Sequence, residues 1–220
     1  ADEDLPEPAT LFDDWKDNAS PARWQELEID GHMDLQFDLF YNLTPAYNGA
    51  ARRGMFDKSA WRNMSRMTPT QLTAWRDHYE PRDAALKKAN LKGKDLVRWK
   101  YQRYAKNYLR CVRGVDESVG TLMRTLDEMG LADNTIVVYS SDQGFYIGDH
   151  GWFDKRWMYE ESLLMPLVIK WPGVTQPGAV DDKHLVQNLD YAETFLEAAG
   201  VEIPGDMQDR KSTRLNSSHQ

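Results

Sequence analysis

Long hydrophobic runs are absent from this chain, and cysteine is almost absent. No apolar stretch in its 220 residues approaches the roughly 18 residues that a membrane-spanning helix needs, so no membrane span is predicted. The single cysteine, Cys111, excludes an internal disulfide. The whole sequence has 41% apolar and 28% charged residues, a balance typical of a globular protein with a hydrophobic core.

The chain also lacks a net positive charge, since 27 Lys and Arg stand against 35 Asp and Glu. Attraction of the whole molecule to nucleic acid or another polyanion is therefore not expected. Residues 87–113 are the exception, with ten Lys or Arg and one acidic residue, Asp95. This segment is either a basic helix face that lines a groove for an anionic polymer or an ordinary solvated face.

Both ends of the chain are unlike those of a complete natural protein. Residues 1–6 are acidic and proline-containing, without the basic and apolar regions of a signal peptide. Residues 209–220 have no periodicity and resemble the translation of a sequencing-adapter oligonucleotide. We therefore expect a fragment in which residues 1–208 are native and residues 209–220 are a non-native tail. A natural polar tail is the alternative.

Helix signals begin after a loop-rich, aromatic-containing stretch over residues 1–66. Thr68 to Gln71 predict an N-cap with a capping box, and Pro81 is expected to end or interrupt the helix that follows. Apolar residues at spacings of three and four predict a second helix over about 95–129. Gly130 suits the left-handed residue after that helix.

The second half of the chain alternates strands and helices. Residues 135–140 and 166–170 are apolar and predict two strands, the first of them buried. A last helix is expected from Asn188 or Asp190 to Ala199, ended by Gly200. This order predicts an α/β fold.

Polar side chains follow the first of these strands. Ligands of open α/β sheets bind outside the carboxyl ends of strands. Asp142 and Gln143 offer hard oxygen ligands that suit Ca²⁺ or Mg²⁺, provided that both lie beyond the strand end, where Gly144 permits a turn. An ordinary polar turn is the alternative.

Further along the same loop, His150 and Lys155 could bind an anion. His150 lies between Gly148 and Gly151, which would let a ligand approach the backbone, and its ring could donate to an anionic oxygen. A hydrogen bond within the loop is the alternative role of His150. Lys155 could contact a sulfate or phosphate oxygen, or pair with a neighbouring acid. The aromatic residues nearby could stack on a sugar or pack inside the protein: Trp152, Phe153 and Trp157.

Residues 141–162, from Ser141 to Ser162, resemble the second-half signature of the type I, formylglycine-dependent sulfatases. The resemblance covers most of residues 34–208. Within the family the chain most resembles bacterial polysaccharide and glycosaminoglycan sulfatases, including those like N-acetylglucosamine-6-sulfatase and iduronate-2-sulfatase. It implies an alkaline-phosphatase-like mixed sheet flanked by helices, present only as a fragment.

The resemblance also implies roles for the candidate residues. Asp142 and Gln143 would bind calcium, Lys155 would contact the sulfate of a sulfated sugar polymer, and His150 would face the substrate. The formylglycine nucleophile comes from a C/S-x-P-x-R motif that this chain lacks. We therefore expect a periplasmic or secreted sulfatase of which this fragment alone is inactive.

Two alternatives to a sulfatase are compatible with the sequence. The first is a phosphodiester or phosphonate hydrolase of the same superfamily, but those relatives favour Asp and His clusters around Mn²⁺ or Zn²⁺, and Gln143 disagrees with that pattern. The second is a non-catalytic module that binds anionic glycans through residues 87–113.

Overall fold

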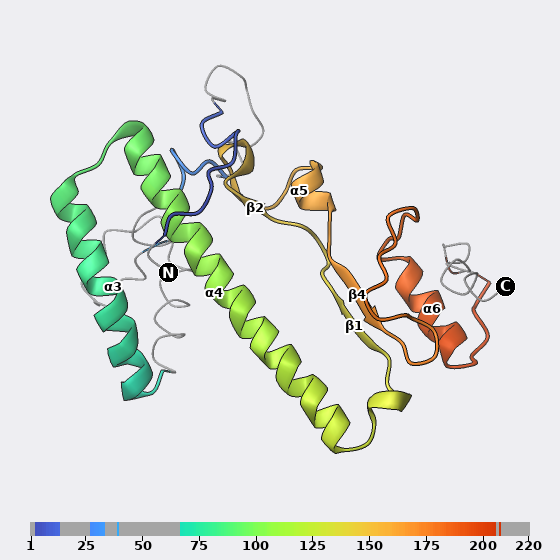
Figure 1. The fold of residues 1–220 in the computed structure, drawn as a ribbon. Coiled ribbons are helices and arrows are strands. Elements are labelled where there is room, and N and C mark those ends of the chain that lie inside the picture. Colours follow the sequence, from blue (N-terminus) through green and yellow to red (C-terminus); the bar gives the residue numbers. More distant parts are fainter. Residues whose placement is uncertain (1–2, 14–26, 34–38, 40–66, 206, 208–220) are drawn as a thin grey trace. The chain divides into compact units, whose positions relative to one another are not determined.

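The computed structural model describes residues 3–13, 27–33, 39, 67–205 and 207. The chain forms two compact units, shown in Figure 1. Unit 1 contains residues 1–119 and 144–164, and unit 2 contains residues 120–143 and 165–220. Most of the expected loop-rich region before residue 67, and the expected tail 209–220, lie outside the described residues. In the part of the chain that is described, no helix is long and apolar enough to cross a membrane.

Unit 1 is built on a pair of helices, α3 (Pro69–Ala89) and α4 (Gly93–Glu128). Helix α4 belongs to this unit as far as Val119. The predicted capping box is confirmed: the Gln71 N–H donates to Thr68 Oγ1 at 3.3 Å, and the Thr68 N–H donates to Gln71 Oε1 at 2.8 Å. The helices lie side by side (Figure 1), and Tyr79 Oη donates to Asn107 Oδ1 at 3.0 Å between them.

The prediction for Pro81 was wrong, because α3 continues through it to Ala89. A proline inside a helix costs about 3 kcal/mol, so another interaction must offset that cost. The helix after Pro81 is anchored to α4, since Leu86 is buried in the core and Asp83 forms an ion pair with Arg103. Tertiary packing here overrides a local signal.

The core of unit 1 lies between the helices and the N-terminal segment. Its buried residues are Leu11, Ile29, Met33, Leu39, Leu86, Val97, Tyr101 and Ala105. Tyr101 Oη donates to the Pro6 carbonyl at 2.6 Å, and burial raises the pKa of the Tyr101 phenol. Gln102 donates to the Leu5 carbonyl at 2.8 Å and accepts from the Leu5 N–H at 2.9 Å, which fixes this segment on α4.

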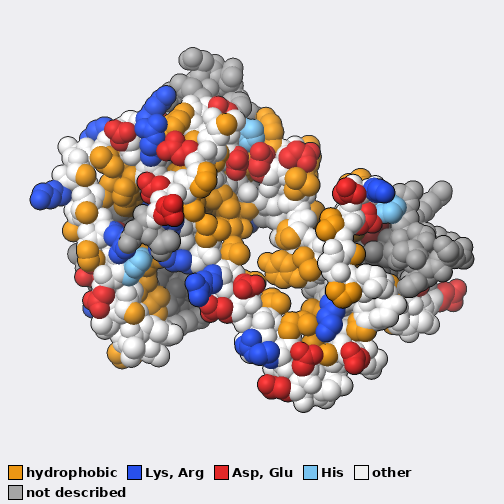
Figure 2. Space-filling model, viewed as in Figure 1, with side chains coloured by type: hydrophobic (Ala, Val, Ile, Leu, Met, Phe, Trp, Pro, Cys, Tyr) orange, Lys and Arg blue, Asp and Glu red, His pale blue; other side chains and the backbone are white. Residues whose placement is uncertain are grey.

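The periodic apolar stripe predicted the helix correctly, but several of its later members are exposed. Tyr104 packs against the core, whereas Val112 and Val115 are exposed. Apolar side chains, in orange, are accordingly visible on the surface in Figure 2. Periodicity fixes which residues share a helix face, while the packing partner of that face comes from elsewhere in the fold.

The basic segment 87–113 is not a continuous exposed face. Lys100 is buried, and its ammonium donates to the carbonyls of Ile29 at 2.9 Å and Asp30 at 3.0 Å. Arg103 is buried as well. Two further cations are paired within unit 1: Arg98 with Glu7, and Lys106 with Asp4, each at 3.0 Å. These contacts remove four of the ten cations from a groove for an anionic polymer, while Lys87, Lys88, Lys92 and Lys94 are exposed.

The predicted loop 141–156 contains structure that its sequence did not indicate. It holds β2 (Tyr146–Ile147), the short 3₁₀ helix η3 (Asp149–Gly151) and β3 (Phe153–Asp154), and α5 (Glu160–Leu163) follows it. Strands β2 and β3 pair antiparallel, with Tyr146 opposite Asp154. The part of the loop from Tyr146 to Asp154 is therefore a small hairpin within unit 1 rather than an irregular segment.

Unit 2 contains the 3₁₀ helix η2 (Ala132–Asn134), β1 (Val137–Ser140), β4 (Leu167–Lys170) and α6 (Asp190–Ala198). All four lie within two residues of the predicted turn, strands and helix. Strands β1 and β4 pair antiparallel, with Ser140 opposite Leu167. Ser140 Oγ lies 2.8 Å from Tyr191 Oη, which ties α6 to the end of β1.

The expected burial of β1 was wrong within the described residues. Its sheet has two strands there, so each strand pairs on one side only. Tyr139 of β1 and Val168 of β4 are exposed. A β-branched run predicts a strand, but burial also requires a covering layer on each face.

Candidate functional site

The Asp142–Gln143 pair forms a bend in unit 2, directly after β1. Strand β1 ends at Ser140, so both residues lie beyond the strand end, as predicted. Ser141 Oγ donates to the Gln143 carbonyl at 2.8 Å, and Asn188 Nδ2 donates to the Asp142 carbonyl at 3.2 Å. These bonds hold the backbone of the bend, while the side chain of Asp142 is exposed and that of Gln143 is half-buried.

Gly144 serves a purpose different from the predicted one. Its backbone does not occupy the left-handed region. Its N–H donates to the Ser162 carbonyl at 2.8 Å, and the next N–H, of Phe145, donates to the Glu161 carbonyl at 2.7 Å. A Cβ at this position would overlap the Glu161 carbonyl and lie 2.7 Å from that of Leu164. Glycine is needed here for the close approach of two backbone segments rather than for a turn.

We expect Gly144→Ala to destabilise unit 1 by about 2 kcal/mol or more, because rigid backbone carbonyls cannot move away from the new methyl group. Gly114→Ala in α4 is the matched control. Its Cβ would meet nothing within 4 Å, so we expect about 0.5–1 kcal/mol of stabilisation. Urea unfolding followed by tryptophan fluorescence measures both variants. Equal midpoints for the two would contradict this account of Gly144.

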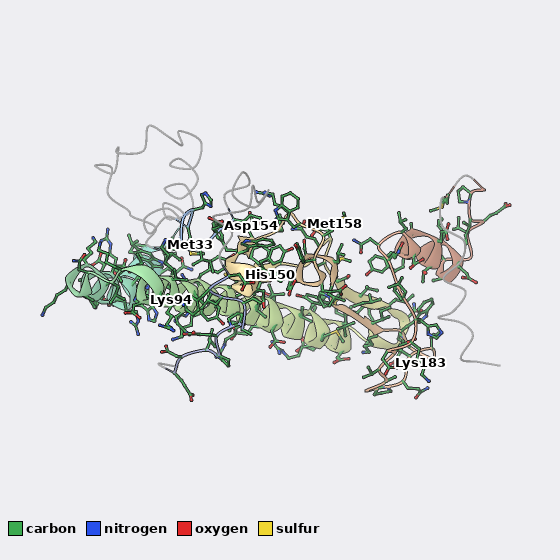
Figure 3. All side chains as sticks on the ribbon, turned by 90° about the horizontal axis from the view of Figure 1, so that it is seen from above. Met33, Lys94, His150, Asp154, Met158 and Lys183 are labelled. Atoms are coloured by element: carbon green, nitrogen blue, oxygen red, sulfur yellow. The ribbon has the colours of Figure 1, made fainter. Side chains whose placement is uncertain are left out.

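His150, labelled in Figure 3, lies in η3 between the two strands of the hairpin of unit 1. Several neighbours hold it there. Its own φ is +59°, in the left-handed region, and its N–H donates to Thr10 Oγ1 at 2.8 Å. Its Nε2 lies 3.3 Å from Glu161 Oε2, and its Nδ1 lies 3.9 Å from Asp13 Oδ2. The ring is 20% exposed, so a ligand could still reach it.

The glycines on each side of His150 serve packing. A Cβ on Gly148 would lie 2.7 Å from the Tyr101 ring, and one on Gly151 would lie 3.2 Å from the Leu11 carbonyl. Both glycines also have positive φ, +100° and +70°. The close approach that they allow is therefore to other parts of unit 1.

The aromatic residues around His150 pack inside unit 1. Trp152 is buried and meets Tyr146 edge-on at 5.4 Å. Tyr146 Oη donates to the Trp157 carbonyl at 2.8 Å, and burial raises the pKa of that phenol. Phe153 packs edge-on against Tyr104 at 5.8 Å. The packing alternative is thus confirmed for Trp152 and Phe153, and Trp157 packs against the same buried cluster.

Lys155 follows β3 directly, in a small cluster of charges. Its Nζ lies 3.8 Å from Asp154 Oδ1, and Arg156 Nη2 lies 3.3 Å from Asp154 Oδ2. The side chains of Lys155 and Arg156 are both partly exposed. Two cations share one carboxylate, so the cluster keeps a net positive charge that could meet an anion.

The candidate residues fall into two groups. His150 and Lys155 belong to unit 1, and Asp142 and Gln143 belong to unit 2. In the described ranges no three His, Cys, Asp or Glu residues form a cluster that could hold a metal ion. One carboxylate and one amide oxygen at an exposed bend fit part of a Ca²⁺ shell, because that ion takes six to eight oxygen ligands.

Three neighbours of His150 were missed from the sequence: Thr10, Asp13 and Glu161. Glu161 lies inside the 141–162 signature, eleven residues from His150, and that signature was the one signal that could have indicated it. Thr10 and Asp13 lie more than 130 residues away along the chain. No short-range pattern connects them with the histidine.

Comparison with known proteins gives this geometry a context. Residues 148–220 match the family described as N-sulphoglucosamine sulphohydrolase, C-terminal. An N-acetylglucosamine-6-O-sulfatase of Bacteroides thetaiotaomicron is 42% identical over 207 residues, which are 93% of this chain and 36% of that protein. The human N-acetylglucosamine-6-sulfatase is 34% identical over 99 residues, 44% of this chain and 18% of that protein.

A solved structure supports the same assignment. A protein whose structure was solved in complex with its substrate D-glucosamine-2-N,6-O-disulfate is 40% identical, with a TM-score of 0.79 over 94% of this chain and 41% of that one. This chain therefore spans about two fifths of that protein. Its own small antiparallel sheets are parts of the alkaline-phosphatase-like fold of the solved sulfatases. The chain belongs to the sulfatase family.

Proposed function

We propose that residues 1–208 are a C-terminal part of the catalytic domain of a longer sulfatase. This enzyme hydrolyses sulfate esters on a sulfated sugar or polysaccharide, in the periplasm or outside the cell. The observation that carries the proposal is the 42% identity to an N-acetylglucosamine-6-O-sulfatase across 93% of the chain. The disulfated glucosamine bound by the solved relative favours an amino-sugar sulfate as substrate.

Each candidate residue has a role in this proposal. The ammonium of Lys155 contacts a sulfate oxygen, since the cluster around Asp154 keeps a net positive charge. The ring of His150, 20% exposed, donates a hydrogen bond to a substrate oxygen. The Asp142 carboxylate and the Gln143 amide oxygen supply part of a calcium shell. When bound, the cation would neutralise charge on the sulfate group.

The nucleophile belongs to another part of the enzyme. In the proposed mechanism the nucleophile is a formylglycine, which is made from a C/S-x-P-x-R motif. The 220-residue sequence does not contain this motif. The 220-residue chain on its own therefore binds the anion weakly and does not turn over substrate.

The calcium assignment predicts an effect on metal affinity. In the longer enzyme, Asp142→Ala should weaken Ca²⁺ binding by about tenfold or more, because one charged ligand is lost. Titration calorimetry with Ca²⁺ measures the affinity without any need for turnover, and hydrolysis of an aryl sulfate after chelation and readdition of Ca²⁺ measures the linked activity. Asp133→Ala, which removes another exposed carboxylate of unit 2, is the control. Equal Ca²⁺ affinity in both variants would contradict the assignment of Asp142 as a calcium ligand.

A further inference from the structure

We propose that Glu161 is a positioning residue that orients the His150 ring for the substrate. The inference rests on the proposed function, because it assigns a partner to a residue of that same site. Glu161 Oε2 lies 3.3 Å from His150 Nε2, within hydrogen-bonding distance. The side chains of both residues are partly buried, at 32% and 20% exposure, so the contact lies at the edge of unit 1 rather than in bulk solvent.

The backbone of Glu161 is fixed independently of its side chain. Its carbonyl accepts the Phe145 N–H at 2.7 Å, and the neighbouring Ser162 carbonyl accepts the Gly144 N–H at 2.8 Å. Gly144 follows the Asp142–Gln143 bend directly in the chain. One residue of α5 therefore joins the segment after the proposed calcium ligands to the histidine of the hairpin.

The remaining sides of the ring are held by other parts of unit 1. The Tyr159 ring lies 4.9 Å away and the Trp152 ring 5.3 Å away. The His150 N–H is bonded to Thr10, which stabilises the left-handed backbone of this residue. The ring thus has limited freedom, and the carboxylate selects among its remaining orientations and tautomers.

A carboxylate at one ring nitrogen of His150 determines whether the other ring nitrogen accepts or donates a hydrogen bond. When Nε2–H donates to Glu161, the ring is held in the tautomer in which Nδ1 can accept a hydrogen bond, and after protonation Nδ1 can donate one. Nδ1 lies on the side of Asp13, whose carboxylate is 3.9 Å away and 41% exposed. The carboxylate–imidazole pairs of hydrolases use the same principle, in which the acid orients the ring and a second nitrogen acts on the substrate.

The first test uses the 220-residue chain itself. Long-range ¹H–¹⁵N correlation spectra report the protonated ring nitrogen of each histidine. We expect His150 to carry its proton on Nε2 in the wild-type chain, and Glu161→Leu to produce a mixture of tautomers. Glu160→Leu, which removes the exposed neighbouring acid of α5, should leave the wild-type tautomer. An unchanged tautomer in Glu161→Leu would overturn the proposal.

The second test uses the longer enzyme. Glu161→Leu should lower kcat by about tenfold with KM changed less than twofold, since orientation of a catalytic group acts in the transition state. Glu161→Gln keeps the size of the side chain and an oxygen acceptor, so it should retain folding and lose about threefold in kcat. If Glu161→Leu fails to fold, Glu161→Gln decides, and wild-type kcat with the wild-type tautomer would overturn the role of Glu161.

Different results would contradict the proposed function and the positioning role of Glu161. An inactive wild-type enzyme, or one unaffected by Lys155→Ala, would contradict the proposed function and leave the tautomer result standing. An active wild-type enzyme in which Glu161→Leu has normal kcat would contradict only the positioning role.

Discussion

Lys155→Ala in the longer enzyme is expected to lower kcat/KM for a sulfated sugar by at least about tenfold. A tenfold loss corresponds to about 1.4 kcal/mol of transition-state binding, a modest value for one charge-assisted contact. Charge accumulates on the sulfate and leaving-group oxygens as the ester bond breaks, so a cation on the sulfate stabilises the transition state more than the ground state. Steady-state hydrolysis of a 6-sulfated glucosamine derivative measures the effect.

Two control variants separate the contact from a general loss of charge. Lys183→Ala removes an exposed cation of unit 2, and we expect it to change kcat/KM by less than twofold. Lys155→Arg keeps the charge but replaces a compact ammonium with a planar fork, so partial activity is expected. Full activity of Lys155→Ala would refute the sulfate contact, and an equal loss in Lys183→Ala would show that only the net charge matters.

Local signals in the sequence predicted most elements of the structure. The capping box at Thr68 and the left-handed glycines after α4 and α6 depend on interactions within a few residues. Such interactions are encoded next to the element that they form. The two strands of unit 2 were indicated by their own apolar residues, although β1 pairs with the distant β4. These predictions were therefore confirmed within about two residues.

The predictions that were wrong or incomplete involve contacts between segments that are distant in the sequence. Helix α3 continues through Pro81 because Leu86 and Asp83 pack on α4, and Lys100 is buried because two carbonyls some 70 residues away accept its hydrogen bonds. Residues that are neighbours in space but not in sequence leave no periodic signal. The same holds for the candidate site, where the 141–162 signature indicated His150 and Lys155 but neither Asp13 nor Thr10, which contact His150 from the N-terminal segment.

Asp83→Ala is expected to destabilise the chain by about 3–5 kcal/mol, the largest stability effect among these variants. Arg103 is 6% exposed and lies 3.0 Å from the Asp83 carboxylate. Arg103 also donates to the Leu39 carbonyl at 3.2 Å, and its guanidinium stacks over the Tyr79 ring at 4.1 Å. Removal of the carboxylate leaves a buried cation without its counter-charge, which costs far more than a lost surface ion pair.

Burial of the Asp83–Arg103 pair also costs desolvation free energy, and this cost predicts how a double variant behaves. Burial raises the pKa of the Asp83 carboxyl more than the Arg103 guanidinium lowers it. A raised pKa means that the contribution of this carboxyl to stability is present at low pH and falls as the pH rises through the folded-state pKa. The double variant Asp83→Leu with Arg103→Met should therefore be more stable than Asp83→Ala by about 2 kcal/mol or more at pH 7.

Urea unfolding of the wild type, Asp83→Ala and the double variant, followed by tryptophan fluorescence, measures these differences in stability. Glu117→Ala is the control, because Glu117 pairs with Arg113 at 2.9 Å with both side chains exposed. We expect a loss of about 0.3–0.5 kcal/mol there, as for other i,i+4 surface pairs. If Asp83→Ala costs no more than Glu117→Ala, then water reaches Arg103 and the ion pair does not anchor α3 after Pro81. If the double variant is as unstable as Asp83→Ala, then the pair contributes more through its charge than its burial costs.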